Sequence, residues 1–501
     1  MADETTNDIY ENKYKITIGL EIHVELLTES KMFCSCSTKF GEKENSQVCP
    51  VCVGLPGSLP VFNYKTLELG IKTALALNCQ IPSECVFVRK SYFYPDLPKN
   101  FQISQYNQPL AINGYLNINN KKTPLRRIHL EEDTGKLIHS EHNENISLVD
   151  FNRAGVPLME IVTEPGISSP QEAEAFLLEL KKILQYIEVS DCNMEEGSLR
   201  CDANISVNFY DSKELGTKTE IKNMNSFKSV RKALQFESVR QMHLLETNKK
   251  VIQETRLWDE TNQTTESMRT KEEAHDYRYF PEPDLLPIKI PQDIVEKISL
   301  QIGEIPAQKQ KRFLDQYNLS EYNISVLTSE KKLADYFEET VSFYKEPEIV
   351  SNWIQTVLLG ILKERNISIK ICPISSKNFA ELIELVNSKK ITATSGKEVL
   401  TEMLDTGKSA IEIVNEKHLI QVQDEKTIRQ WVKEVITEYP KAVKDYWDAI
   451  DAQNNVQASN ISNFLKGMVM KKSKGKADIL IVAKILMEEL DNVRAKTRQT
   501  R

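Results

Sequence analysis

The clearest pattern of hydrophobic and polar positions lies in residues 15–26. Apolar side chains there alternate strictly with polar or small ones, at Ile16, Ile18, Leu20, Ile22, Val24 and Leu26. A period of two is that of a β-strand with one buried face, so Glu21, His23 and Glu25 share the opposite face. Gly19 lies on that polar face and would leave room for a bulky ligand. A solvated strand face would show the same pattern, so this strand alone leaves both interpretations open.

Three further segments alternate in the same way. Polar residues from Asp202 to Asn208 alternate with apolar ones, and Lys218, Glu220 and Lys222 share one face of residues 218–222. Residues 127–133 run from an alternating segment into three consecutive acids. If these strands form one sheet, acidic and basic groups converge on its polar face. Carboxylates bind Mg²⁺ together with phosphate oxygens, and lysine and arginine hold phosphates, so this face predicts ATP-dependent phosphoryl transfer.

The pattern changes near residue 290. Strands and turn signals precede a group of prolines that ends at Pro291, and helical patterns with few glycines follow it. A second, weaker boundary falls at Thr406-Gly407. Beyond it, residues 428–436 show the spacing of an amphipathic helix, which Tyr439-Pro440 interrupts. We therefore expect a disordered tail at 1–12, a strand-rich domain at 13–290, and helical domains at 291–406 and 407–501.

Composition restricts the class of protein. The 501 residues are 40% hydrophobic and 27% charged, which is typical of a folded globular chain. No apolar run reaches the roughly 18 residues of a membrane span, and the acidic, polar start of the chain lacks the features of a leader peptide. The net charge of -8 excludes a uniformly basic nucleic-acid binder. Nine cysteines, an odd number, favour a reducing compartment and predict a cytoplasmic protein.

Four of these cysteines form a compact motif. Cys34, Cys36, Cys49 and Cys52 follow the pattern C-x-C-x12-C-x-x-C. Two close pairs of thiolates match tetrahedral Zn²⁺ with no open position, so the motif predicts a structural zinc site. Unmetallated thiols are the alternative interpretation.

The sequence contains no standard nucleotide-binding loop, because the motifs G-x-x-x-x-G-K-[ST] and G-x-G-x-x-G are both absent from it.

A basic segment near the C-terminus contains five lysines and no acid: Lys466, Lys471, Lys472, Lys474 and Lys476. Such a run is either a solvated face or a contact with the RNA backbone.

Several long motifs together carry a family resemblance. They occupy residues 18–25, 34–52, 92–99, 129–136, 149–165, 194–206, 218–227 and 275–283. With these motifs the chain resembles the B subunits of the tRNA-dependent amidotransferases, the aspartyl/glutamyl-tRNA(Asn/Gln) transamidating enzymes, nearly from end to end.

The resemblance implies an α+β fold: a cradle-shaped mixed or antiparallel sheet domain of the glutamine-synthetase-like kinase type, an all-α domain and a small all-α tail that touches tRNA. It also implies a reaction. ATP phosphorylates the side-chain carboxylate of glutamate or aspartate on misacylated tRNA(Gln) or tRNA(Asn), and ammonia then displaces phosphate. The implied cofactors are ATP, Mg²⁺ and Zn²⁺. The implied partners are the glutaminase (A) and the small (C) subunits of the same enzyme, in a heterotrimer.

Matched position by position, Glu21, His23, Glu132 and Glu220 resemble the magnesium and ATP site of the family. Strand parity instead places Glu131 on the polar face, and we keep it as the second choice. The resemblance adds weaker candidates, with Arg200, Asp202 and Lys222 in the same pocket and Lys90 and Lys99 on the ammonia path. The alternative function is a zinc-containing tRNA-binding scaffold without catalysis. Such a scaffold has no need of these acidic groups on one face.

Overall fold

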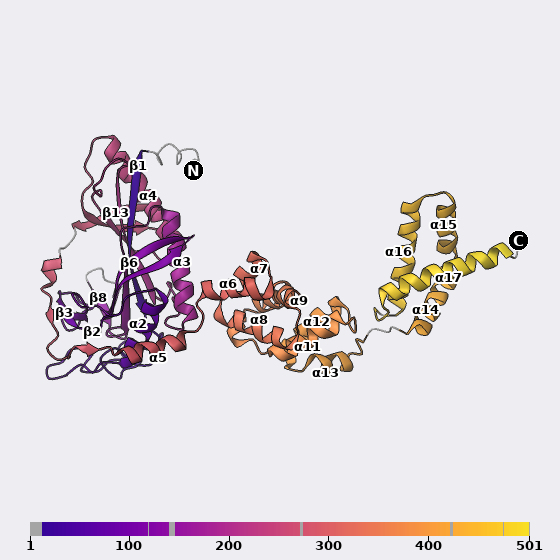
Figure 1. Cartoon of the computed structure of the whole chain (residues 1–501), viewed down its shortest axis with the longest axis horizontal. Coiled ribbons are helices and arrows are strands. Elements are labelled where there is room, and N and C mark those ends of the chain that lie inside the picture. Colours follow the sequence, from indigo (N-terminus) through magenta and orange to yellow (C-terminus); the bar gives the residue numbers. More distant parts are fainter. Residues whose placement is uncertain are drawn as a thin grey trace. The chain divides into compact units, whose positions relative to one another are not determined.

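The structure is a computed structural model that describes residues 13–118, 120–139, 146–270, 274–420, 424–473 and 475–499. The tail expected at residues 1–12 lies outside the described residues. The chain divides into two compact units, Met1–Lys309 and Gln310–Arg501 (Figure 1). Unit 1 carries the strands and unit 2 is helical, so the predicted fold class, an α+β domain followed by helical domains, is confirmed.

A mixed sheet organises unit 1. Its strand order is β13-β12-β11-β10-β1-β9-β6-β5, and every neighbouring pair is antiparallel except β11 and β12. The strands are β1 (Tyr14–Glu25), β5 (Ala111–Ile118), β6 (Lys121–Glu132), β9 (Pro157–Thr163), β10 (Leu199–Phe209), β11 (Thr219–Lys222), β12 (Glu254–Asp259) and β13 (Thr264–Thr270). The long β1 lies between β10 and β9, and its alternation fits an antiparallel strand with one buried face.

Helices cover the apolar face of this sheet. Ile18, Leu20 and Ile22 of β1 are buried in one core with α2 (Tyr64–Ala76), α3 (Pro170–Tyr186) and α4 (Phe227–Glu246). The start of α3 is set locally, because the Ser169 hydroxyl accepts from the Glu172 amide at 3.1 Å and Pro170 follows the cap. Since these helices occupy one face, the polar side chains of the strands lie on the other.

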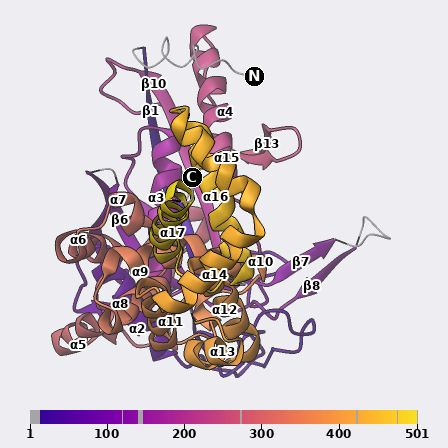
Figure 2. The same ribbon diagram turned by 90° about the vertical axis from the view of Figure 1, so that its right-hand side faces the viewer.

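Short strands border one end of the sheet. They form the groups β14-β3-β4, β15-β2 and β7-β8, and Figure 2 shows the last as a projecting hairpin. Their bounds are β2 (Glu84–Cys85), β3 (Val88–Ser91), β4 (Phe101–Ser104), β7 (Lys136–His139), β8 (Ser147–Asp150), β14 (Phe280–Pro281) and β15 (Ile288–Lys289). The Gln102 side-chain amide of β4 donates to the Glu132 carbonyl at 2.7 Å, which fixes β4 against the end of β6. Helix α5 (Gln292–Ile302) completes the main elements of this unit.

Unit 2 contains two apolar cores among its described residues. One runs from Phe313 to Val414 and the other from Ile428 to Leu490. The first core is built by α6 (Pro306–Tyr317), α7 (Glu321–Leu327), α8 (Lys331–Phe343), α9 (Pro347–Trp353), α10 (Leu359–Glu364), α11 (Ser376–Asn387), α12 (Ala393–Thr406) and α13 (Ala410–Glu416). The second is built by α14 (Glu425–Glu438), α15 (Pro440–Asp451), α16 (Asn455–Lys472) and α17 (Ile479–Gln499).

The amphipathic helix expected at residues 428–436 is confirmed as the buried face of α14, and the chain turns into α15 at Pro440. Within the described ranges, no helix is both long and apolar enough to span a membrane.

Candidate functional site

The polar face of the sheet brings together side chains from five strands. Glu21 lies opposite Asp202 of β10, and His23 lies opposite Arg200 on one side and Glu160 of β9 on the other. Further along, Asn204 pairs with Glu220 of β11, and Glu220 pairs with Thr255 of β12. Because directly paired residues share a face, the expected convergence of charged groups is present.

Two of these side chains, His23 and Glu160, are arranged together with Glu131 of β6 so that they could hold a cation. The Nε2 atom of His23 lies 3.4 Å from Glu160 Oε2 and 3.7 Å from Glu131 Oε1. One ligand atom from each of the three residues lies within 4.8 Å of the others. Two carboxylates and an imidazole are a donor set that suits a divalent cation. We call His23, Glu131 and Glu160 the cation triad.

Electrostatics keep the triad carboxylates ionised. Burial alone would raise the pKa of Glu160, but the imidazoles of His129 and His23 outweigh it and hold that pKa well below its usual range. Burial likewise opposes ionisation of Glu131, and its hydrogen bond with His129 nevertheless lowers its pKa. His129, which lies on β6, therefore helps to keep both carboxylates ionised. Its Nε2 atom is 3.1 Å from Glu160 Oε2 and 3.6 Å from Glu131 Oε2.

The structure places the second choice, Glu131, beside His23 and places Glu132 elsewhere. Strand β6 continues through Glu132, so the alternation does not stop there, and parity places Glu131 with His23. The Glu132 carboxylate faces the other way. It accepts from the Ile103 amide at 2.9 Å and forms an ion pair with Lys99.

The other predicted pocket residues continue the polar face. Lys222 Nζ lies 2.6 Å from Asp202 Oδ2 and 3.8 Å from Glu220 Oε1. The Thr255 hydroxyl donates to Glu220 at 2.7 Å, and the Asn204 amide donates to Glu21 at 3.0 Å. A cavity of about 610 Å³ lies over this face, and it is lined by Glu21, His23, Lys90, Asp202, Lys218, Glu220 and Lys222 among others. We call it the sheet cavity.

Arg200 has a different role from the other candidates. Its guanidinium lies 2.7 Å from the buried carboxylate of Asp133, which Arg153 also approaches at 3.6 Å. Its side chain does not line the sheet cavity. This pairing neutralises Asp133 at the end of β6.

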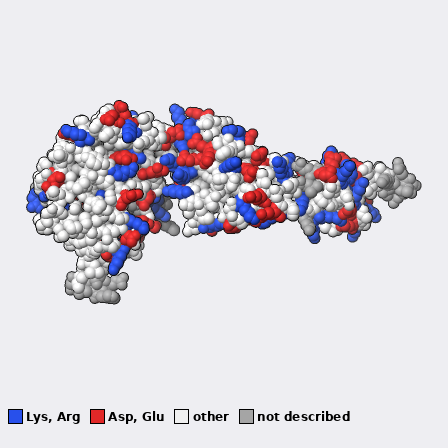
Figure 3. Space-filling view, turned by 90° about the horizontal axis from the view of Figure 1, so that it is seen from below, with Lys and Arg blue, Asp and Glu red and all other residues white. Residues whose placement is uncertain are grey.

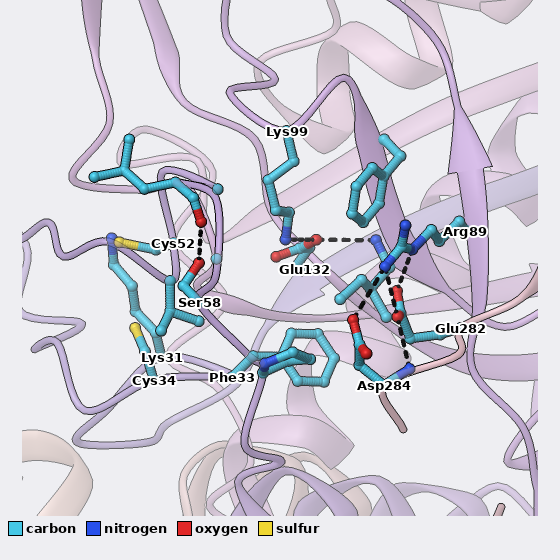
Figure 4. Close-up of a pocket in the computed structure, with 17 residues that line it drawn as sticks. Lys31, Phe33, Cys34, Cys52, Ser58, Arg89, Lys99, Glu132, Glu282 and Asp284 are labelled. Carbon is cyan, nitrogen blue, oxygen red and sulfur yellow. Dashed lines mark hydrogen bonds and ion pairs between the residues drawn. The ribbon is translucent and has the colours of Figure 1, made fainter. Parts of the chain in front are cut away.

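A second, smaller cavity of about 120 Å³ contains Lys99 and Glu132 (Figure 4). Its wall also holds Arg89, whose guanidinium binds Glu282 at 2.7 and 2.9 Å, and two cysteines of the four-cysteine motif. We call it the lysine cavity. The two lysines expected on one ammonia path are thus separate, because Lys90 lines the sheet cavity and Lys99 lines the lysine cavity.

The four cysteines do converge. One sulfur from each of Cys34, Cys36, Cys49 and Cys52 lies within 4.8 Å of the others, and all four are free thiols. The Cys49 amide donates to Cys52 Sγ at 3.1 Å, and hydrogen bonding with Cys34 lowers the pKa of Cys52 to about 4. Four soft donors at this spacing fit a closed tetrahedral metal site.

The basic segment lies at the end of α16 and just beyond it. Lys471 is exposed and Lys466 and Lys476 are half-buried, while Lys472 pairs with Glu434 at 2.9 Å and also with Glu438. Lys474 lies outside the described residues. On the face shown in Figure 3, positive and negative side chains are interspersed.

Sequence reasoning missed Glu160 and His129. Glu160 is the one charged residue in the buried strand Pro157–Thr163, and a lone acid in an apolar run carries a cost unless it binds something. His129 has the same parity as Glu131 on β6. Both signals are present in the sequence.

Comparisons with known proteins match nearly the whole chain. The model of the GatB/GatE catalytic domain matches residues 16–296, and that of the GatB domain matches residues 335–490. The chain is 51% identical over 482 residues to the B subunit of the aspartyl/glutamyl-tRNA(Asn/Gln) amidotransferase of Caldanaerobacter subterraneus subsp. tengcongensis, covering 95% of this chain and 99% of that protein. It is 50% identical to the same subunit of Thermodesulfovibrio yellowstonii, with the same coverage, and 49% identical to that of Caldicellulosiruptor saccharolyticus, covering 96% and 100%.

Proposed function

The chain belongs to the GatB/GatE family, and from this premise we propose that it is the B subunit of an aspartyl/glutamyl-tRNA(Asn/Gln) amidotransferase. In this proposal it converts glutamate on tRNA(Gln), aspartate on tRNA(Asn), or both, into the corresponding amide. The family membership agrees with the sheet cavity, where acidic and basic side chains face one space. An enzyme of translation with these substrates works in the cytoplasm.

The reaction needs activation because a carboxylate oxygen is a poor leaving group. A side-chain carboxylate oxygen of the tRNA-bound amino acid attacks the γ-phosphorus of ATP, and the bond from that phosphorus to ADP breaks. Ammonia then attacks the acyl carbon, the carbon–oxygen bond to phosphate breaks, and the nitrogen loses a proton to give the amide. The protein mainly positions the reactants and stabilises charge.

The observation that carries this proposal is the cation triad, two of whose members, His23 and Glu160, line the sheet cavity. His23, Glu131 and Glu160 offer one nitrogen and two carboxylate groups at a distance suited to one small cation. Bound Mg²⁺ would draw electron density from the phosphate oxygens and offset the charge that develops during transfer. Glu21 and Glu220 extend the acidic face, while Lys218 and Lys222 are placed to hold phosphate groups.

The four-cysteine motif is proposed to hold structural Zn²⁺. Four sulfur donors leave no open position, so the metal would fix the loop between β1 and α2 and take no part in the reaction. This loop forms part of the wall of the lysine cavity through Cys34 and Cys52.

The lysine cavity is proposed to lie on the route of ammonia. Glu132, which pairs with Lys99 in this cavity, is the neighbour on β6 of Glu131 in the cation triad, so a molecule leaving Lys99 is close to the triad. Ammonia would come from a glutaminase partner, the A component of the enzyme, with the small C component completing a heterotrimer. The exposed Lys471, with Lys466 and Lys476, is proposed to touch the phosphates of tRNA.

The experiment that tests this function uses the assembled heterotrimer with the change His23→Ala. We expect loss of tRNA-dependent ATP hydrolysis and of amide formation, because the triad then lacks its nitrogen ligand. Glutamine hydrolysis by the partner is retained, although it can fall through coupling. If His23→Ala hydrolyses ATP and amidates tRNA as the wild type does, the alternative of a non-catalytic zinc-containing scaffold replaces this proposal.

A further inference from the structure

One wall of the sheet cavity is aromatic. Tyr106, Tyr277 and Tyr279 line it together with Lys90. The rings of Tyr106 and Tyr279 are stacked, with centroids 4.4 Å apart and planes 7° from parallel, and the Tyr277 ring lies 6.0 Å from that of Tyr279. The Lys90 ammonium lies 4.9 Å from the centre of the Tyr277 ring. We call these three rings the tyrosine wall.

The tyrosine wall is not a part of the hydrophobic core. All three rings are half-buried, and none belongs to the apolar cluster that holds the sheet and its helices together. Aromatic rings at the surface of a polar cavity are stacking platforms for nucleobases, and a neighbouring cation attracts the phosphate that accompanies each base. The wall therefore has the chemistry of a nucleoside site.

Residues next to the tyrosine wall reach the lysine cavity. On β3, Lys90 lines the sheet cavity and its neighbour Arg89 lines the lysine cavity. After the tyrosines, the same chain segment continues to Glu282, which also lines the lysine cavity. The tyrosine wall thus stands at the end of the sheet cavity that adjoins the proposed ammonia route.

The opposite end of the polar face offers a separate space. A cavity of about 410 Å³ extends over Gly19 and shares Glu21 and Lys218 with the sheet cavity. A Cβ atom added at Gly19 would meet only Thr163 Oγ1, at 4.0 Å, so the strand surface there is open. This flat, open floor suits the nucleoside of ATP, and the shared lysine suits its phosphates.

The two adenosine-bearing substrates, the aminoacyl-tRNA and ATP, are assigned to opposite ends of the polar face by the requirements of the reaction. Ammonia must reach the acyl carbon, so the aminoacyl group belongs at the end near Lys90. The phosphoryl donor must approach from the far side of the cation triad, because donor and acceptor oxygens lie roughly in line in the transfer. We propose that the tyrosine wall binds the 3′-terminal adenosine of the aminoacyl-tRNA, while ATP occupies the Gly19 end. This inference rests on the proposed function and adds to it the residues that recognise the end of the tRNA.

The test measures the binding of uncharged tRNA to the assembled heterotrimer. One tRNA has the complete CCA end and the other lacks only the terminal adenosine. For the wild type we expect the complete tRNA to bind about 10-fold more tightly, which is the scale of one stacked base. Tyr279→Leu removes the flat ring and should bring this ratio close to 1, while the matched control Tyr279→Phe keeps the ring and the ratio.

The KM for ATP is measured on the same variants, and it should change by less than about twofold. A raised KM for ATP with an unchanged tRNA ratio would show that the wall holds the nucleotide, and this would overturn the proposal. A ratio and a KM that both stay at the wild-type value would overturn it as well, since the rings would then be structural. The melting temperature shows whether Tyr279→Leu folds, and Tyr277→Leu supplies the same test if it does not. Since uncharged tRNA is not a substrate, the binding ratio can be read even if the catalytic proposal fails.

Discussion

Glu131 and Glu132 are neighbours on β6, and their carboxylates lie on opposite faces of that strand. Glu131 Oε1 is 3.7 Å from the imidazole of His23, whereas Glu132 is paired with Lys99 in the other cavity. Two identical side chains that are adjacent in the sequence therefore have different surroundings: Glu131 belongs to the cation triad, and Glu132 lines the lysine cavity. Substitutions at the two positions should have different effects.

Changing Lys99 to Met should impair the delivery of ammonia from the partner and leave the amidation reaction itself intact. The variant leaves Glu132 without its cation in the lysine cavity, so transfer of ammonia from the partner should be impaired. We expect glutamine-dependent amidation to fall at least about 10-fold, while amidation with added ammonium chloride stays near the wild-type rate. Equal losses with both nitrogen sources would place Lys99 in the reaction itself.

The four-cysteine site predicts a bound metal. Elemental analysis of the purified protein should give about one zinc per chain, and Cys49→Ser should lose it together with some stability. Cys372→Ser, at a cysteine in unit 2, serves as the control and should keep the metal. A metal-free wild-type protein prepared in reducing, zinc-containing buffer would contradict the assignment.

The lysines near the end of α16 should differ in their contributions to tRNA binding. Replacing Lys466, Lys471 and Lys476 by glutamine should weaken tRNA binding and reduce the slope of log affinity against log salt by about 1 for each phosphate that is no longer bound. Lys472 already pairs with Glu434 and Glu438, so Lys472→Gln should instead lower the melting temperature slightly. An unchanged salt slope in the triple variant would identify these lysines as a solvated face.

Glu254 provides a pH-dependent contribution to stability. Burial opposes its ionisation, but hydrogen bonds from Ser267 and Arg256 lower its pKa, the latter at 2.8 Å. A lowered pKa in the folded state means stability that is present above the ordinary glutamate range and lost as pH falls through the folded-state pKa. Glu254→Gln should therefore reduce the free energy of unfolding at pH 7 by about 1 kcal/mol, which is below the usual value for a hydrogen bond to a charged group because solvent screens this half-buried side chain.

Denaturant titrations at pH 7 and at pH 3 measure this difference. The difference in the free energy of unfolding between Glu254→Gln and the wild type should be smaller at pH 3 than at pH 7. A difference of the same size at both pH values would show that the charge of Glu254 contributes nothing to stability.

The sequence was sufficient for the parts of the site that follow from strand periodicity. Alternation in β1 and the pattern of residues 218–222 correctly placed His23, Glu21 and Glu220 on one face, because a single buried face forces that register. Parity also placed Glu131 on this face, and Glu131 does lie beside His23 because β6 does not end before Glu132. A role for Glu132 at the magnesium site stays a prediction. The cysteine spacing predicted a cluster that the structure shows.

The remaining parts depend on long-range pairing. Glu160 joins the cation triad because β9 lies between β1 and β6, an order that no local pattern specifies. Lys90 and Lys99 line different cavities because β3 is followed by a turn that brings Lys99 to the end of β6. The pairing of Arg200 with Asp133 likewise requires two strands that are distant in the sequence.

The most direct test of the central claim compares Glu131→Gln with Glu132→Gln in the assembled heterotrimer. The assay measures tRNA-dependent ATP hydrolysis and amide formation with ammonium chloride as the nitrogen source, so that ammonia transfer between subunits has no influence. We expect a loss of at least about 100-fold for Glu131→Gln, since a ligand of the cation triad is removed. We expect a small effect for Glu132→Gln. Equal activity of Glu131→Gln and the wild type, or the larger loss in Glu132→Gln, would contradict the assignment of the triad.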